Sequence, residues 1–195
     1  MTTNGTQSHP LFGGSFSAVL PPDAIDVSDL REVADNQEVF VHSRTDQSII
    51  IELLEHQDQV PDQDAARYHF DDVAASNEAS PEVLSVELVD TEQIALQELS
   101  SAWFLSGRQR VAKFAEQARN TVNIHLVLFR LPQYSTDILI TFNDPIVISP
   151  LSSSSTGAES AQTGGPSANS GQPWTLEHFR TTVQSFQLLE PAVFS

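Results

Sequence analysis

Three segments of this sequence alternate apolar and polar residues with the two-residue period of a β-strand. They span residues 84–88, 122–128 and 138–142. The last two are separated by a short polar loop that contains Pro132, so we expect them to form an antiparallel hairpin. Strands of this kind bury one face against another layer, and the chain must therefore build a sheet that is covered by other elements.

Further strands and helices follow from local patterns. We expect short strands over residues 15–20, 38–42 and 103–109, and a strand covered on both faces over the nearly continuous apolar run 48–55. Pro61 begins a helix that continues to about residue 75. Thr175 caps a last helix that Pro191 ends, with apolar residues up to Phe186 at helical spacing. The predicted fold class is α+β, an α/β/α-type sandwich in which helices flank a largely antiparallel sheet.

The length of 195 residues and a hydrophobic fraction of 39% predict one domain with a real core. We expect residues 1–10 to form a flexible tail and residues 11–195 to form the domain. Residues 149–173 are rich in Ser, Gly and Thr and have little to bury, so we expect a disordered insert there.

The formal net charge of −17 resides in the first half of the chain. Residues 1–100 hold 20 acids and 3 bases, whereas residues 101–195 hold 6 of each. A nucleic-acid surface needs Lys and Arg, and an anionic lipid surface is disfavoured for the same reason. A basic protein partner is favoured. Cysteine is absent, and no apolar run approaches the ~20 residues of a membrane span. We expect a soluble monomer of the nucleus and cytoplasm.

The charge is concentrated in a segment where a carboxylate recurs at every third position. The six acids are Asp23, Asp26, Asp29, Glu32, Asp35 and Glu38. Apolar residues run between them and are expected to anchor the segment to the core: Ile25, Val27, Leu30, Val33 and Val39. A segment anchored in this way predicts a shaped anionic surface, with a solvated face that confers solubility as the alternative. Asp35 and Glu38 flank a short polar loop at a strand entrance, where charges lose little freedom on binding.

Motifs for catalysis and cofactor binding are weak. Gly13-Gly14 lacks the residues of a phosphate-binding loop and predicts a turn. His69, Asp71 and Asp72 suggest a metal site, but neighbours on a helix point in different directions, so an ordinary helix face is expected. His42, His56 and His125 are expected to be packed histidines. Since nothing selects a carboxylate pair or a serine nucleophile, we expect no enzyme activity and no cofactor, and an unrecognised hydrolase stays as an alternative.

Six motifs in a fixed order resemble the Ran guanine nucleotide release factor family, and a vertebrate member in particular. They are Leu11-Phe-Gly-Gly, Ile25-Asp-x-Ser-x-Leu-Arg-x-Val, Asp35-Asn-Gln-Glu-Val-Phe-Val, Ser48-Ile-Ile-Ile-Glu-Leu-Leu-Glu, Tyr68-His-Phe-Asp-Asp and Leu128-Phe-Arg-Leu-Pro-Gln-Tyr-Ser-Thr-Asp. The resemblance extends from about residue 11 to 145 and resumes at Trp174. It departs from the family at Ala34, where proline is frequent, and in the Ser/Gly-rich stretch.

The resemblance implies a PsbP-like fold and binding to the small GTPase Ran, with promotion of guanine-nucleotide release in nuclear transport. It implies that Asp35 and Glu38 bind Ran. The residues of the same motif blocks that we expect to frame the surface are Asp26, Ser28, Leu30, Arg31 and Gln37. A voltage-gated sodium channel is a further partner implied for vertebrate members. The competing hypothesis is a general acidic adaptor or chaperone for basic proteins.

Overall fold

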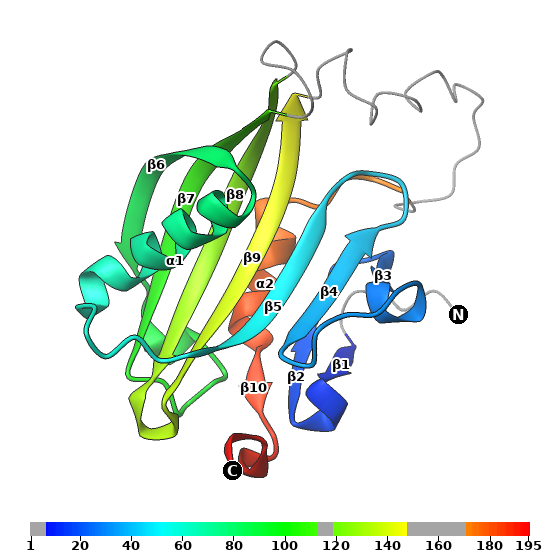
Figure 1. The fold of residues 1–195 in the computed structure, drawn as a ribbon. Coiled ribbons are helices and arrows are strands. Elements are labelled where there is room, and N and C mark those ends of the chain that lie inside the picture. The colour runs from blue at the N-terminus through cyan, green and yellow to red at the C-terminus, as the bar shows by residue number, and fades with distance from the viewer. Residues whose placement is uncertain (1–6, 113–118, 148–170) are drawn as a thin grey trace.

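The computed structural model describes residues 7–112, 119–147 and 171–195, and its centre is a seven-stranded antiparallel sheet (Figure 1). The strands lie in the order β3-β4-β5-β9-β8-β7-β6. Their bounds are β3 Ala24–Asp26, β4 Gln37–His42, β5 Ser48–Glu55, β6 Ala79–Leu88, β7 Ser101–Ala112, β8 Arg119–Leu131 and β9 Thr136–Val147. Helix α1 (Asp62–Ser76) lies on one face, and α2 (Leu176–Ser185) with a small sheet lies on the other. The predicted α+β class is confirmed.

The predicted hairpin is formed by β8 and β9, at the centre of the sheet. A one-turn 3₁₀ helix, Pro132–Tyr134, joins the strands, and Ser135 closes the turn in the left-handed conformation with φ 51°. In β9, Ile138, Ile140 and Phe142 face the α2 side, while Leu139 faces the α1 side. Both faces of this hairpin are therefore covered, which explains its long apolar runs.

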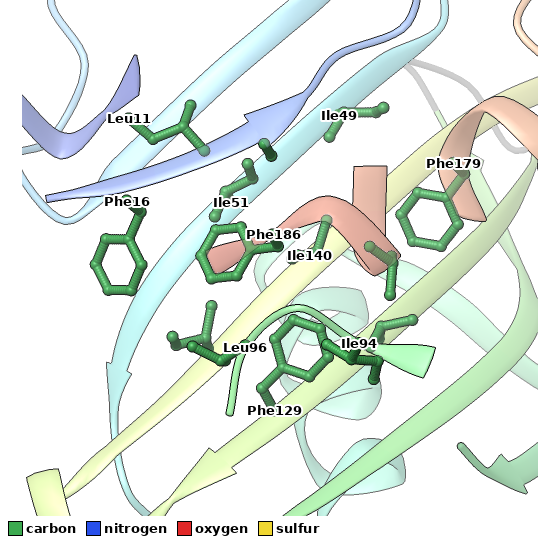
Figure 2. Packing of buried hydrophobic residues seen from close by; sticks show 14 of the residues in the cluster. Leu11, Phe16, Ile49, Ile51, Ile94, Leu96, Phe129, Ile140, Phe179 and Phe186 are labelled. Atoms are coloured by element: carbon green, nitrogen blue, oxygen red, sulfur yellow. The ribbon is translucent and has the colours of Figure 1, made fainter. Parts of the chain in front are cut away.

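The larger core lies between the sheet and α2 (Figure 2). Phe186 stacks on Phe16 with ring centroids 5.1 Å apart, and Phe179 stacks on Phe142 at 5.7 Å. Thr175 caps α2 as expected, through a capping box with His178. The helix ends at Ser185, however, and does not continue to Pro191, because Gln187–Leu188 (β10) pair with Phe16–Val19 (β2).

A small three-stranded sheet packs beside α2. It includes residues that we expected in the flexible tail, so the boundary of the tail is corrected. Strand β1 (Ser8–Leu11) pairs with β2 (Phe16–Val19). Residues 8–10 therefore belong to a strand, and this strand ends at the buried Leu11. The turn between the strands holds three successive residues in the left-handed region, with φ of 51° at Phe12, 67° at Gly13 and 91° at Gly14. Two glycines make this turn feasible.

The chain after residue 170 is fixed to the turn between β4 and β5. Gln47 donates to the Trp174 carbonyl at 2.8 Å and accepts from the Trp174 N–H at 2.7 Å. The Gly171 N–H donates to Asp23 at 3.1 Å, and Trp174 itself is buried. Of the expected insert, residues 149–170 lie outside the described residues, and the last three, 171–173, belong to this attachment.

Helix α1 packs on β6, β7 and β8 and buries Ala65, Ala66 and Phe70 in a second core. Its close approach to β7 occurs at Gly107, where a Cβ atom would lie 2.7 Å from Phe70 Cζ and 2.8 Å from the Glu82 carbonyl oxygen. In Figure 1, α1 crosses the half of the sheet that contains β6 to β8. Among the described residues, neither helix is long and apolar enough to cross a membrane.

The contact at Gly107 predicts a stability effect. Gly107→Ala should lower the free energy of unfolding by about 1–3 kcal/mol, because the added methyl group overlaps Phe70 and backbone that is already paired. Urea denaturation measures this, with Ser80→Ala on the exposed surface of β6 as the control. Equal stability of Gly107→Ala and wild type would contradict the packing of α1 on β7.

Candidate partner-binding surface

The acidic segment, residues 23–38, follows the β3 edge of the sheet (Figure 1). It passes through β3, a 3₁₀ turn at Val27–Asp29 and a loop that enters β4. Val27 and Val39 are buried and anchor it as expected. Ile25 and Leu30 do not: Ile25 is 38% exposed and Leu30 is 72% exposed. The segment is too short and too close to the edge for all its apolar residues to reach the core.

The six acids of this segment divide into two groups. Asp23, Asp26 and Glu38 are half-buried and accept hydrogen bonds from the chain's own groups. The other three are exposed: Asp29, Glu32 and Asp35. Half of the carboxylates therefore hold the segment in shape, and the anionic surface that the sequence predicts presents three exposed carboxylates out of the six. A fixed backbone with exposed carboxylates is suited to binding a basic partner without large loss of entropy.

Asp35 lies in the tight turn before β4. This turn is closed by a hydrogen bond from the Gln37 N–H to the Ala34 carbonyl at 2.9 Å. Asn36 extends the pairing beyond the strand, since its carbonyl accepts from the Leu53 N–H and its side chain donates to the Leu53 carbonyl. The exposed carboxylate of Asp35 therefore projects from a turn that is braced on both sides.

Glu38 lies in β4 and has a structural contact. Its Oε1 accepts a hydrogen bond from the Phe12 N–H at 2.6 Å, which ties β4 to the left-handed turn between β1 and β2. A carboxylate that accepts from a backbone N–H makes one of the stronger hydrogen bonds of a protein. Glu38 is thus half-buried and engaged, whereas Asp35, three residues earlier, is exposed and open to a partner.

The other residues of the expected surface lie around the 3₁₀ turn. Asp26 accepts from the N–H and the hydroxyl of Ser28, at 2.9 and 2.7 Å. Leu30 and Arg31 are exposed beyond the turn. Gln37 differs, because it points to the opposite face of β4 from Glu38 and donates to Glu52 at 2.7 Å. Leu30 adds an apolar contact point to this otherwise polar surface.

A buried ionic cluster under α1 was not predicted. Asp137 is fully buried and accepts from His56 at 2.7 Å, His69 at 3.1 Å and the Arg130 Nε at 3.3 Å. Arg130 also donates to Asp62 at 2.9 Å and to the carbonyl of Val60. Burial alone would raise the pKa of Asp137, but the hydrogen bonds from the two histidines, the charge of Arg130 and the Gln57 N–H together hold that pKa below its ordinary value.

The cluster escaped sequence reasoning because its members lie up to 81 residues apart. One signal was present: Arg130 stands inside the apolar run of β8, and a charge in a core strand requires a buried partner. The cluster also accounts for His69, which the metal hypothesis had grouped with Asp71 and Asp72. His69 is buried against Asp137, whereas both aspartates are exposed. Across the three described ranges, no group of three or more candidate metal ligands occurs.

Comparison with known proteins identifies the family. Residues 9–145 match the family described as Ran-interacting Mog1 protein. The chain belongs to the Mog1 family. A Danio rerio relative named Ran guanine nucleotide release factor is 58% identical over 96% of this chain and 99% of its own length. A Homo sapiens relative of the same name is 48% identical over 97% of each chain.

The solved structures agree with the Mog1 assignment. The crystal structure of the Saccharomyces cerevisiae Ran-binding protein Mog1p covers the full length of both chains, with a TM-score of 0.71 at 26% identity. A structure of a Mog1 E65A mutant gives a TM-score of 0.68 at the same identity and covers 97% of this chain. The antiparallel sheet and its flanking helices are therefore the Mog1 fold.

The contrast between Asp35 and Glu38 predicts different stability effects in this Mog1 chain. Glu38→Ala should lower the free energy of unfolding by about 1.5–3 kcal/mol, because the Phe12 N–H loses a charged acceptor in a strained turn. Asp35→Ala should change it by less than about 0.5 kcal/mol, as for other exposed sites. Chemical denaturation of both variants measures the difference, and equal values would contradict the anchoring role of Glu38.

The buried cluster predicts both a mutational effect and a pH effect. Asp137→Ala should cost about 3–5 kcal/mol, since Arg130 is left as a buried charge that has lost one of its two carboxylate partners. Because the pKa of Asp137 is lowered in the folded state, its contribution is complete above the ordinary value of 3.8 and is lost as the pH falls below that value.

Urea titrations from pH 7 to pH 2 check this prediction. The fall in stability below pH 3.8 should be shallower in Asp137→Asn than in wild type, because one carboxylate no longer takes up a proton on unfolding. Asp58→Asn, at an exposed position, is the control. Identical pH profiles for Asp137→Asn and wild type would show that Asp137 does not couple folding to proton uptake.

Proposed function

We propose that this chain binds the small GTPase Ran and promotes release of its guanine nucleotide, as a factor in nucleocytoplasmic transport. Support comes from the family, whose vertebrate members are named Ran guanine nucleotide release factor. The relative from Schizosaccharomyces pombe is named nuclear import protein mog1. The observation that carries the proposal for this chain is the braced acidic segment, which exposes three carboxylates beside an exposed leucine.

The acidic segment suggests how binding promotes release. A GTPase holds its nucleotide through backbone N–H groups, a lysine and Mg²⁺ at the phosphates. A protein that binds a conformation lacking those contacts shifts the population toward the nucleotide-free state. Exposed carboxylates such as Asp35 pair with basic groups of Ran in that conformation. Glu38 contributes by fixing the backbone from which Asp35 projects, and its second oxygen extends the acidic surface.

Release by binding requires no covalent chemistry, and the buried cluster supports this part of the proposal. Within the described ranges, the two histidines and the aspartate under α1 are the group that most resembles an acid–base site. Both oxygens of Asp137 are occupied, by His56 and Arg130 on one side and by His69 and the Gln57 N–H on the other. A carboxylate with four donors stabilises the fold and is poorly placed to accept a substrate proton.

Charge reversal tests the proposal. Asp35→Lys should weaken Ran binding by roughly 2–5 kcal/mol if the carboxylate is enclosed at the interface, without loss of fold stability. Asp58→Lys makes the same charge change at an exposed position outside the segment and should bind as wild type does. Isothermal titration with Ran measures both affinities, and wild-type affinity of Asp35→Lys would contradict the assignment.

Nucleotide release tests the activity itself. Labelled nucleotide should leave preloaded Ran faster as wild-type protein is added. The ratio of added protein to Ran that is needed for full release distinguishes catalytic from stoichiometric release. Histones in excess should not compete, since a general acidic adaptor would bind any basic protein and depend little on Asp35. The sodium-channel partner stays a prediction of the family resemblance, and the monomeric state and the nuclear and cytoplasmic location stay predictions of the sequence.

A further inference from the structure

A pocket of about 280 Å³ lies on the α1 face of the sheet, next to the helix. Its floor is formed by β5 and β9, whose alternation places Ile50, Glu52 and Thr141 on this face. Its wall is one stripe of α1, in which His69, Asp72, Val73 and Ser76 recur at helical spacing. Because α1 packs on β6, β7 and β8, the pocket occupies the part of the sheet beside the helix.

The floor of this pocket contains an unsatisfied polar group. Thr141 is 3% exposed, and within the described part of the chain its hydroxyl has no hydrogen-bond partner. A buried polar group left without a partner costs about 1–3 kcal/mol, so a ligand that bonds it regains that energy. Glu52 is its diagonal neighbour in the β5–β9 register, which places the two side chains about 7–8 Å apart. The polar groups of both residues therefore lie on the same part of the floor.

The charge of the pocket selects the ligand. Glu52 and Asp72 line it, and no Lys or Arg does. Gln37 donates to one oxygen of Glu52, which leaves the other free for a ligand. The Nε2 of His69 is engaged with Asp137. The lining therefore favours a cation that donates hydrogen bonds.

The size of the pocket and its apolar lining residues restrict the class of ligand further. Small-molecule sites span about 300–1,000 Å³, so this pocket suits a single side chain better than a cofactor. Leu54, Val73 and Leu139 provide apolar contact for a methylene stem, which lysine and arginine carry below their charged ends. A bare metal ion would gain nothing from that apolar lining.

The pocket adjoins the acidic segment. Gln37 lines it and directly follows Asp35 and Asn36, and Asn36 is hydrogen-bonded to Leu53 of the floor strand β5. We propose that this pocket receives a lysine or arginine side chain of the protein partner that the acidic segment binds. The inference rests on the proposed function for the identity of the partner, and on the pocket alone for the chemistry of the contact.

Three substitutions test the pocket through Ran affinity. Glu52→Gln and Asp72→Asn remove charge and preserve shape, and Thr141→Val replaces the hydroxyl by a methyl group. Glu52→Gln should weaken Ran binding about tenfold or more. Glu82→Gln, on β6 at the opposite edge of the sheet, makes the same charge change and should stay within about twofold of wild type. A double-mutant cycle against Lys→Gln and Arg→Gln variants of Ran should find one coupled residue.

A substitution that fills the pocket with a side chain of this protein provides a test that leaves Glu52 and Asp72 unchanged. Ser76→Lys places a basic side chain at the exposed end of the α1 stripe, where it competes for the pocket and should weaken Ran binding. Ser80→Lys, exposed on β6, adds the same charge elsewhere and should not. Wild-type Ran affinity in Glu52→Gln, Thr141→Val and Ser76→Lys, alongside a loss in Asp35→Lys, would overturn the pocket proposal and leave the proposed function standing.

A titration without Ran separates the two proposals. Nα-acetyl-lysine amide, followed by NMR, should shift the backbone amides of Glu52, Asp72 and Thr141 in wild type and not in Glu52→Gln. Nα-acetyl-norleucine amide carries the same stem without the charge and should leave them in place. Shifts with the lysine probe support the pocket even if Ran itself fails to bind. Equal shifts with both probes, or none with either, would overturn it.

Discussion

The central pairing of β8 with β9 is the constraint on which the other elements depend. These two strands carry the apolar residues of both cores, so α1 and α2 each need them as a floor. The hairpin closes at the end where Arg130 and Asp137 meet, directly opposite each other in the register. The bonds of this pair reach α1 through His69 and Asp62, and the segment before α1 through His56 and Gln57. One buried ion pair therefore orients the helix relative to the sheet.

That orientation has consequences for the candidate partner surface. With α1 held over β6 to β8, the helix does not extend over β4 and β5, and the pocket forms along its side. The acidic segment then adds its exposed carboxylates at the adjoining edge. The anionic character of this region depends on the number of acids in the chain. It depends equally on the position of α1, which determines the part of the sheet that the helix leaves uncovered.

Much of the fold was predictable because its signals are local. The alternation in β8 and β9, the apolar run of β5 and the Thr175 cap each specify one element through neighbouring residues. The errors arose where a distant contact overrides the local pattern. Phe186 has helical spacing, yet β10 follows it because Gln187 and Leu188 find a partner in β2. Residues 8–10 look like a tail, yet they pair with the same strand.

The position of the candidate surface was predictable from the sequence, but the roles of its individual acids were predictable only in part. Acids at every third residue indicated the segment, but sequence alone could not tell that Glu38 meets the Phe12 N–H, 26 residues away. The same limit applies to Asp137, whose partners come from three separate parts of the chain. A carboxylate's spacing identifies where charge gathers, whereas its function depends on which donors the fold delivers to it.

The attachment at Gln47 and Trp174 bears on how this family tolerates variation in length. Strand β9 ends at Val147, and the chain is clamped again from Gly171 onward by bonds to Asp23, His42 and Gln47. Both anchor points are independent of how many residues separate them. Loop-closure entropy grows only logarithmically, by about 0.6 kcal/mol for each doubling. We therefore expect a change in the number of residues between the two anchor points to leave the packing of α2 unchanged.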